Sequence, residues 1–279
     1  MYNIVTKKEL ASKIKLLEVH APEIAEKAQP GQFVILRVDE TGERIPLTLV
    51  DWNSEKGTIS LIFLEVGVST EKLGTLEANG AIKDVIGPLG NPSEIKHYGT
   101  VCVIGGGVGT ASAYPITRAL KQAGNRVITI IGAKTASLLI LEDEIRKVSD
   151  ELLISTDDGT KGQKGFVSDV LKGLIEKGYA FDVVYAIGPT VMMRAVAETT
   201  RPYKIHTVVS LNPIMVDGMG MCGACRVSVG GQTRFACVEG PEFDAHKVDF
   251  NELLKRQSAY VSEEKQALQR WQNRGCAYE

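Results

Sequence analysis

The sequence lacks any long apolar run and any strong excess of one charge. Its 279 residues contain no stretch of about 18 consecutive apolar residues, so we expect no membrane-spanning helix. The first residues, MYNIVTKKELASKIKLLEV, lack the continuous apolar core of a secretory signal peptide. Charged residues make up 24% of the chain and the net charge is −2. This balance argues against a nucleic-acid-binding protein and against a basic membrane-binding surface.

Cysteine is also scarce, and its distribution favours reduced thiols over a disulfide framework. The chain has 5 cysteines, an odd number, and three of them lie between residues 222 and 237. Such crowding is typical of reduced thiols at a metal site. We therefore expect a cytoplasmic protein with bound metal. Internal repeats and low-complexity tracts are absent from the sequence.

Three regions differ in the pattern of their residues. Residues 1–97 contain short runs rich in β-branched residues, such as GQFVILRV and GTISLIFLEV, bounded by Gly, Asn and Pro, which predict a small antiparallel β-barrel or sandwich. In residues 98–212, buried-type strands alternate with helical segments, which predicts a doubly wound parallel α/β domain. Residues 213–279 combine a segment rich in Gly and Cys with an amphipathic helix over about 248–272.

A glycine-rich loop follows the first predicted strand of the second region, in GTVCVIGGGVG (99–109). Glycines at a strand-to-helix turn let the backbone approach a phosphate, and the helix N-terminus favours negative charge. The spacing is not a strict G-x-G-x-x-G, so a tight turn without a ligand is the alternative. The second strand ends in IIGAKT, with Lys134 where an acidic ribose ligand is usual. The residues alone therefore leave NAD and NADP both open.

Two further loops follow predicted strands at the same edge of the sheet, STDDGTKGQKG and AIGPTVMM. Ligands of open α/β sheets bind outside the carboxyl ends of the strands, so these loops are placed to line a nicotinamide pocket. Ordinary turn chemistry is the alternative for the Asp-Asp-Gly sequence. The nucleotide-binding residues that we predict are Gly105, Gly106, Gly107, Val108, Gly109, Thr110, Gly132, Ala133, Lys134, Thr156, Asp157, Asp158, Gly159, Gly188, Pro189 and Met192.

The first region carries a pattern suited to a flavin. In GERIPLTLV, Arg44 can hold a pyrophosphate by paired hydrogen bonds, and Thr48 can reach the isoalloxazine edge. Downstream, EVGVSTEKL offers backbone amides and hydroxyls, and GPLGNP (87–92) closes the barrel. An ordinary strand with one exposed arginine is the alternative. The predicted FAD-binding residues are Arg44, Ile45, Pro46, Leu47, Thr48, Leu64, Glu65, Val66, Gly67, Ser69 and Thr70.

The cysteine segment resembles a [2Fe–2S] motif with one thiolate missing. Cys222 and Cys225 form a C-x2-C pair and Cys237 follows, but the position that completes C-x4-C-x2-C is occupied by Asp217. A carboxylate carries the same formal charge as a thiolate and is a harder donor. The alternatives are a degenerate site, or a fourth thiolate from Cys276 in the tail or from Cys102, which lies in an apolar strand typical of a core.

Taken in order, R-x-P-L-T, V-G-x-S-T, G-P-L-G, G-G-G-V-G-T-A, T-D-D-G and G-P-x-x-M-M resemble the ferredoxin–NADP reductase superfamily over nearly the whole chain. The segment LNPIMVDGMGMCGACRV (211–227) is most similar to small subunits of NADH-dependent reduced ferredoxin:NADP+ oxidoreductase, also called sulfide dehydrogenase, which are related to the electron-transfer subunit of dihydroorotate dehydrogenase B. In that branch an aspartate is the fourth cluster ligand, which here matches Asp217, together with Cys222, Cys225 and Cys237. The dihydroorotate relatives have cysteine there.

The resemblance implies an oxidoreductase subunit that moves electrons between NAD(H), FAD and a [2Fe–2S] cluster. Hydride would pass between the nicotinamide and flavin N5, and no acid–base side chain is required for that step. A large partner subunit would carry a second FAD and [4Fe–4S] clusters, where NADP(H) and ferredoxin react, and electron bifurcation is implied. The alternatives are a subunit for dihydroorotate oxidation, one for sulfide or polysulfide reduction, and a regulatory subunit without cofactors.

Overall fold

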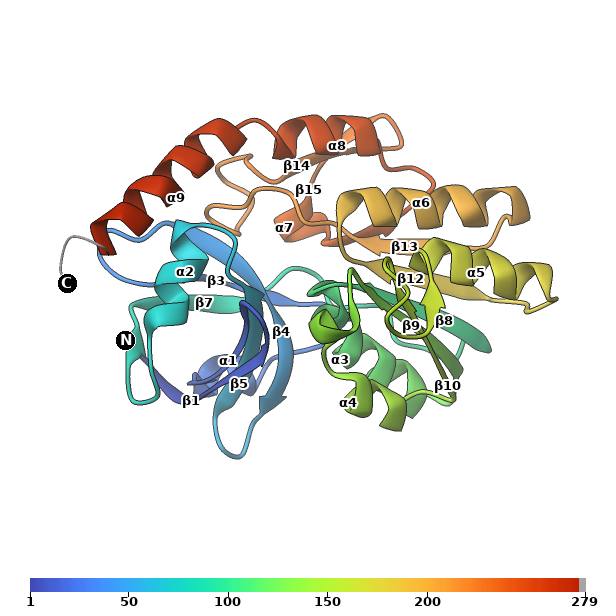
Figure 1. Cartoon of the computed structure of the whole chain (residues 1–279), viewed down its shortest axis with the longest axis horizontal. Helices are drawn as coiled ribbons and strands as arrows, with labels where there is room; N and C mark the ends of the chain where they lie inside the picture. Colours follow the sequence, from blue (N-terminus) through green and yellow to red (C-terminus); the bar gives the residue numbers. More distant parts are fainter. Residues whose placement is uncertain (276–279) are drawn as a thin grey trace.

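The computed structural model describes residues 1–275, which form two large sheets and a C-terminal segment (Figure 1). The first sheet has seven antiparallel strands in the order β6-β1-β2-β5-β4-β3-β7 and curls into the predicted barrel. Its strands are β1 (Tyr2–Ala11), β2 (Ile14–His20), β3 (Phe33–Arg37), β4 (Arg44–Asn53), β5 (Thr58–Leu64), β6 (Ala81–Ile82) and β7 (Asp84–Leu89). Two short helices, α1 (Pro22–Ala25) and α2 (Val68–Thr75), flank it.

The barrel interior is filled by aliphatic side chains from neighbouring strands. Leu61 of β5 lies opposite Leu17 of β2 and Leu49 of β4, and none of the three has exposed surface. Successive side chains of a strand point to opposite faces, so residues two apart share the interior. Burial of these leucine side chains contributes about 1.5–3 kcal/mol each to the free energy of folding and so stabilises the closed barrel.

The second sheet is parallel except at one edge, in the order β11-β10-β9-β8-β12-β13-β16. Its strands are β8 (Thr100–Gly106), β9 (Arg126–Ala133), β10 (Glu151–Thr156), β11 (Gln163–Lys164), β12 (Val183–Ile187), β13 (Thr207–Ser210) and the antiparallel β16 (Glu242–Asp244). Within this sheet the chain first forms the central strand β8 and then adds β9 and β10 on one side of it. It afterwards crosses to the other side of β8, where it forms β12 and β13. This reversal between β8 and β12 is the topological switch point at which open α/β sheets bind ligands.

Helices cover both faces of the second sheet, as the doubly wound prediction requires. Val101 and Val103 of β8 pack with α3 (Gly109–Gln122), whereas Cys102 and Ile104 pack with α5 (Val167–Glu176) and α6 (Thr190–Thr200). Cys102 is fully buried among these apolar side chains, and burial raises the pKa of its thiol. The remaining short helices are α4 (Glu142–Lys147), η1 (Ala136–Leu138) and η2 (Arg201–Tyr203). The predicted fold class is confirmed.

The C-terminal segment returns to both sheets. It contains a hairpin, β14 (Arg226–Val229) and β15 (Gln232–Phe235), then α7 (Ala236–Glu239), strand β16 in the second sheet, α8 (Phe250–Gln257) and α9 (Val261–Gly275). Asp249 caps α8 by accepting hydrogen bonds from the amides of Asn251 and Glu252, both at 3.0 Å.

The single amphipathic helix expected over 248–272 is instead two helices. Phe250 and Leu253 of α8 are buried, whereas the first turns of α9 are exposed. The apolar residues of this region form two groups separated by a polar stretch. The first group packs into the core on the second sheet, and the second group lies beside α2 of the barrel. At the far end of α9, Lys72 of α2 lies 6.0 Å from the centre of the Trp271 ring, and Gln272 donates to Glu71 at 3.1 Å. In Figure 1, α9 therefore arches from α8 to the barrel.

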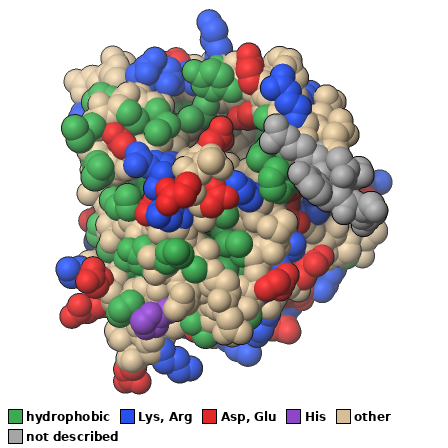
Figure 2. All heavy atoms as spheres, turned by 90° about the vertical axis from the view of Figure 1, so that its left-hand side faces the viewer, with side chains coloured by type: hydrophobic (Ala, Val, Ile, Leu, Met, Phe, Trp, Pro, Cys, Tyr) green, Lys and Arg blue, Asp and Glu red, His purple; other side chains and the backbone are tan. Residues whose placement is uncertain are grey.

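The face that carries α2 and the end of α9 has mixed charge. Figure 2 shows acidic, basic and apolar side chains interspersed there, without a large area of one sign. Several of these charges are paired, as in Lys72 with Asp39 and Lys7 with Glu77. Within residues 1–275, no helix is both long enough and apolar enough to span a bilayer.

Candidate redox site

One large pocket, of about 1070 Å³, lies where the barrel, the second sheet and the C-terminal segment meet. The barrel supplies residues of β3, β4 and β5, and the second sheet supplies the loops after its strands. Residues 210–213, Met215 and Pro241 complete the wall. The pocket includes the turn after β8 and the turn after β12, so it lies at the switch point. A cavity of this size with a mostly apolar wall is typical of a cofactor site.

The barrel wall of the pocket contains about half of the predicted flavin residues. Six of them line it: Pro46, Leu47, Thr48, Leu64, Val66 and Thr70. The other five do not: Arg44, Ile45, Glu65, Gly67 and Ser69. Glu65 instead forms an ion pair with Lys15 at 2.6 Å, and both side chains are largely buried. This pair accounts for Glu65 without a ligand.

The turn that precedes α2 is held by capping hydrogen bonds and is open at Gly67. The Thr70 hydroxyl accepts from the amides of Val66 (3.0 Å) and Gly67 (3.1 Å), so it stabilises the helix start. A Cβ at Gly67 would meet no atom within 4 Å, so space for a ligand remains there. Ser69 contacts Glu43 at 3.4 Å, which brings α2 beside the strand that begins with Arg44. Arg44 is exposed, and no hydrogen bond or ion pair of its guanidinium occurs within the described residues.

On the nucleotide side, the glycine loop divides into close-packed and open positions. A Cβ at Gly105 would lie 2.7 Å from Thr110 Cα, and one at Gly109 would lie 2.5 Å from the carbonyl oxygen of Ile187. These two glycines allow α3 to pack closely on the strand ends. Gly107 has φ +56° and open space beside its Cα, so its backbone is accessible from the pocket. An anion approaching there meets the N-terminus of α3.

Eleven of the sixteen predicted nucleotide residues line the pocket: Gly106, Gly107, Val108, Gly109, Gly132, Ala133, Lys134, Asp157, Gly188, Pro189 and Met192. The five that do not are Gly105, Thr110, Thr156, Asp158 and Gly159. Thr156 is buried and its hydroxyl bonds both the amide and the carbonyl of Lys161, so it closes the loop. Asp158 accepts from Thr160, which lowers the pKa of its carboxyl and makes a local turn. Only the first aspartate of the pair therefore faces the pocket.

The structure adds pocket residues that the sequence patterns did not indicate. They come from the barrel (Gly31, Phe33), from the start of α5 (Phe166, Ser168), and from the segment after β13 (Asn212, Met215). Phe166 is a large exposed aromatic residue. Its place in the sequence, directly after the strand-end loop STDDGTKGQKG, is the one signal by which it could have been chosen.

The three cysteines of the C-terminal segment differ in exposure. Cys225 and Cys237 are buried, with their sulfur atoms 3.1 Å apart, whereas Cys222 is exposed. The amide of Gly220 donates to Cys237 Sγ at 3.1 Å, the kind of N–H···S contact that stabilises a cluster thiolate. Burial raises the pKa of the Cys237 thiol to about 12. Cys222 and Cys225 lie on the loop before β14, and Cys237 lies in α7. Thiolates are the donors that iron–sulfur clusters prefer, so the chemistry of these three residues fits such a cluster.

Asp217 lies at the base of the same loop. Its carboxylate accepts hydrogen bonds from three backbone amides, those of Met219 (3.0 Å), Met221 (3.2 Å) and Cys222 (2.7 Å). These donors hold its pKa below the usual range, so it is ionised at neutral pH. Within residues 1–275 no three His, Cys, Asp or Glu side chains are grouped as metal ligands. Cys276, the alternative ligand, lies outside the described residues.

The loop that contains Asp217, Cys222 and Cys225, here called the cluster loop, packs against the barrel at Gly218. This residue has φ +73°, and a Cβ there would lie 2.7 Å from both Ile35 Cγ1 and Leu89 Cδ1. A side chain at this position would push the loop away from the barrel. The close approach places the cysteine segment directly beside strands β3 and β7.

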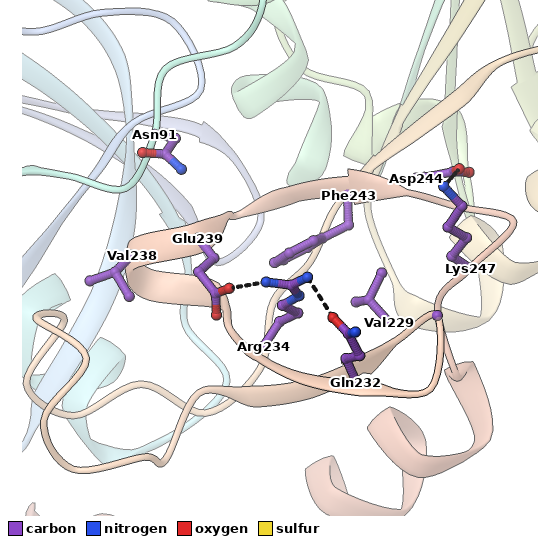
Figure 3. A pocket seen from close by; sticks show the side chains of 10 residues that line it. Asn91, Val229, Gln232, Arg234, Val238, Glu239, Phe243, Asp244 and Lys247 are labelled. Carbon is purple, nitrogen blue, oxygen red and sulfur yellow. Dashed lines mark hydrogen bonds and ion pairs between the residues drawn. The ribbon is translucent and has the colours of Figure 1, made fainter.

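A second cavity, of about 660 Å³, lies behind the cysteine segment (Figure 3). Its polar side chains are largely paired with one another: Arg234 contacts Glu239 at 2.6 Å and Gln232 at 2.7 Å, and Lys247 contacts Asp244 at 3.2 Å. Arg234 and Lys247, the two cationic residues of this cavity, therefore already have partners within the protein. These contacts need no ligand to explain them.

Comparisons with known proteins agree with this geometry. Residues 212–249 match the iron–sulfur cluster binding domain of dihydroorotate dehydrogenase B. A dihydroorotate dehydrogenase B (NAD(+)) electron transfer subunit homolog from Thermotoga maritima is 48% identical over 269 residues, which cover 94% of this chain and 95% of that protein. The chain belongs to the family of dihydroorotate dehydrogenase B electron-transfer subunits and their homologues.

One further relative by sequence and one solved structure support the same family assignment. The dihydroorotate dehydrogenase B electron transfer subunit of Bacillus cereus strain Q1 is 32% identical over 256 residues, covering 88% of this chain and 96% of that one. A chain from the structure of an NADH-dependent reduced ferredoxin-NADP oxidoreductase, solved in a study of flavin-based electron bifurcation, superposes with a TM-score of 0.92. It is 47% identical and the match covers 97% of this chain and 98% of that chain. The prediction of a flavin- and iron–sulfur-dependent electron-transfer subunit is confirmed by membership of this family.

Proposed function

We propose that this family member takes electrons from NADH in the cytoplasm and delivers them, through FAD and a [2Fe–2S] cluster, to a large partner subunit. The partner would carry a second FAD and [4Fe–4S] clusters and would react with NADP(H) and ferredoxin. The single observation that carries the proposal is the shared pocket, whose wall includes β4 of the barrel, the glycine loop after β8, and residues 210–213 and Met215 leading to the cysteines.

The residues of the chain have separable roles in this proposal. A bound FAD supplies the conversion between a two-electron hydride and single electrons. Arg44 and the open turn at Gly67 would hold its pyrophosphate, and the backbone at Gly107 would hold that of the nucleotide. Leu47, Met192 and Met215 line the pocket between these ends and would exclude water from the reacting rings. Cys222, Cys225, Cys237 and Asp217 would hold the cluster.

The choice of NADH over NADPH depends on the far end of the pocket. Asp157 and Lys134 both line it, one suited to a ribose 2′-hydroxyl and the other to a 2′-phosphate. We expect NADH to reduce the flavin faster than NADPH at equal subsaturating concentrations in a stopped-flow experiment. Asp157→Asn should reduce this preference, and Lys134→Ala should leave it intact. Faster reduction of the wild-type flavin by NADPH would overturn the choice and assign Lys134 to the phosphate.

A docking surface for the partner is supported by the side chains around the cysteines. Ile214, Val216, Met219, Met221 and Val238 are all exposed there, and Met221 is 84% exposed. Adjacent exposed apolar side chains are typical of protein interfaces. We expect Met221→Glu to weaken the complex with the large subunit, measured by co-purification and calorimetry. Val5→Glu, at an exposed valine of the barrel, is the control and should have no effect.

Two rivals remain distinguishable by experiment. A subunit for dihydroorotate, sulfide or polysulfide chemistry would share every feature above and differ in its partner, so identification of the co-purifying large subunit separates them. A regulatory subunit without cofactors would show no visible absorption after purification. Flavin and iron analysis of the native complex, with NADH- and NADPH-linked assays, therefore tests the whole proposal.

A further inference from the structure

Three polar side chains from distant parts of the chain meet at one edge of the pocket. Thr190 begins α6, Asn212 follows β13, and Gln257 ends α8. Gln257 Nε2 lies 2.9 Å from the carbonyl oxygen of Asn212 and 3.1 Å from its Oδ1. The hydroxyl of the buried Thr190 lies 2.8 Å from Gln257 Oε1 and 3.1 Å from Asn212 Oδ1.

The donors and acceptors of this cluster fix the direction of the Asn212 amide. Gln257 Nε2 is a donor to both oxygens of Asn212, which leaves Gln257 Oε1 to accept the single hydroxyl hydrogen of Thr190. The carbonyl end of the Asn212 side chain therefore faces the protein. Its Nδ2 has no hydrogen-bond partner within the described residues, and the exposed side chain of Asn212 lines the pocket.

Most of the residues that line the pocket together with Asn212 are apolar. They include Pro189, Val191, Met192, Pro213 and Met215. In cofactor pockets a small number of fixed polar groups among apolar residues determine how the ligand is oriented. An exposed NH₂ group whose amide is held in one orientation is available to an acceptor on the ligand. Carbonyl oxygens are the acceptors that both redox rings of this site have, in the pyrimidine ring of a flavin and in the carboxamide of a nicotinamide.

We infer that Asn212 donates a hydrogen bond from Nδ2 to a carbonyl oxygen of a redox ring bound in the pocket, and that Gln257 positions Asn212 for this bond. The inference rests on the proposed function, since it presumes such a ring in the pocket. Gln257 is a positioning residue, because it acts through Asn212. Its neighbour Arg256 donates to the carbonyl oxygen of Ala224, between two of the cysteines, at 3.1 Å. The end of α8 thus contacts both the pocket and the cluster loop.

The test compares Asn212→Asp with wild type in the FAD-loaded chain with its native partner. The substitution keeps the acceptor Oδ1 and replaces the donor NH₂ by an oxygen. If the bond goes to the nicotinamide, we expect the apparent Kd for NADH to rise about tenfold or more, with the flavin potential unchanged. If it goes to the flavin, we expect the midpoint potential in a dithionite titration and the visible absorption maxima to shift, with NADH binding unchanged.

Either of these patterns supports the inference, and unchanged NADH binding together with an unchanged flavin potential and spectrum overturns it. If the aspartate variant loses FAD altogether, Asn212→Ala places no charge in the wall and gives the same comparison. A wild-type flavin that NADH fails to reduce would count against the proposed function alone, because the dithionite titration still reports on Asn212.

The positioning role is tested by combining substitutions. Gln257→Leu should cause the same kind of change as Asn212→Asp, but a smaller one, and the double variant should resemble Asn212→Asp. Gln122→Leu, at an exposed glutamine at the end of α3, is the matched control and should behave as wild type. A full additional loss in the double variant would mean that Gln257 acts independently of Asn212 and would remove its positioning role.

Discussion

At the scale of single residues, neighbours in the sequence have different tasks. Asp157 faces the pocket, whereas Asp158 closes a turn. Gly107 is open to a ligand, whereas Gly105 and Gly109 allow close packing. The predicted residues therefore gather around one pocket, but membership of a motif does not decide whether a residue lines it.

Arg44→Ala tests the flavin site at this scale. The guanidinium has no ion-pair partner within the described residues, so its removal breaks no ion pair among them. We expect FAD to bind roughly ten- to a hundredfold more weakly, since charge-assisted hydrogen bonds contribute about 1.5–3 kcal/mol. Flavin content and a fluorescence titration measure this. Arg146→Ala, which removes a surface pair with Glu142, is the control. Equal FAD affinity in both variants would contradict the assignment.

Asp217 offers a second test, because its carboxylate either binds an iron of the cluster or only accepts hydrogen bonds from the backbone of its own loop. As the fourth ligand it would bind one iron, so Asp217→Ala should lose the cluster or leave it labile. Asp217→Cys should still assemble a [2Fe–2S] centre, with a lower potential, because thiolate donates more electron density. Iron content and the EPR spectrum of the reduced protein report both results.

The hydrogen bonds from Met219, Met221 and Cys222 define the competing outcome. If Asp217 only shapes the loop, Asp217→Ala would keep a stable cluster and Cys276→Ser would destroy it. That pair of results would remove Asp217 from the ligand set.

At the scale of elements, the C-terminal helices α8 and α9 contact different parts of the protein. α8 is buried on one side and contacts the pocket and the cluster loop, whereas α9 is exposed over most of its length and reaches α2. A cut after Gly240 would also remove β16 from the second sheet. A cut after Tyr260 removes α9 alone and is the sharper experiment.

We expect the chain truncated after Tyr260 to retain FAD and iron, because α9 contributes to neither the pocket nor the cysteine segment. Its affinity for the large subunit should fall at least about tenfold, a loss of about 1.4 kcal/mol, if α9 docks on the partner. Calorimetry with the isolated large subunit measures this. Trp271→Ala, which removes only the contact with Lys72, separates docking from packing on α2. An unchanged affinity after truncation would remove α9 from the interface.

At the scale of the whole molecule, Glu242 links the two sheets. It belongs to β16, and its Oε1 accepts from Ser93 of the connecting segment at 2.6 Å. Burial raises the pKa of its carboxyl to about 7, and the bond from Ser93 only partly opposes this. A raised carboxyl pKa means that the folded state binds a proton more tightly than the unfolded chain. Glu242 therefore stabilises the fold at low pH, and this contribution is lost as pH rises from about 4.5 to about 7.

The corresponding experiment compares the free energy of unfolding at pH 5 and pH 7.5 in wild type and Glu242→Gln. Wild type should lose up to roughly 3 kcal/mol more than the variant over this interval, since one pKa unit corresponds to about 1.4 kcal/mol. Glu263→Gln, on the exposed face of α9, is the control. The same pH dependence in wild type and Glu242→Gln would show that this carboxyl does not titrate in the interval.

The sequence by itself determined the features that contiguous residues encode. Alternation of strands and helices, the glycines after β8 and the C-x2-C pair all depend on local geometry, so they predicted the fold class, the switch-point site and the cysteine segment. The tertiary structure alone decided which side chains share the pocket. Asn212 meets Gln257 from 45 positions away, and Gly218 meets Ile35 across most of the chain. Such contacts depend on how separate elements pack, and no local pattern encodes that packing, because burial and hydrogen bonding are satisfied between elements rather than within them.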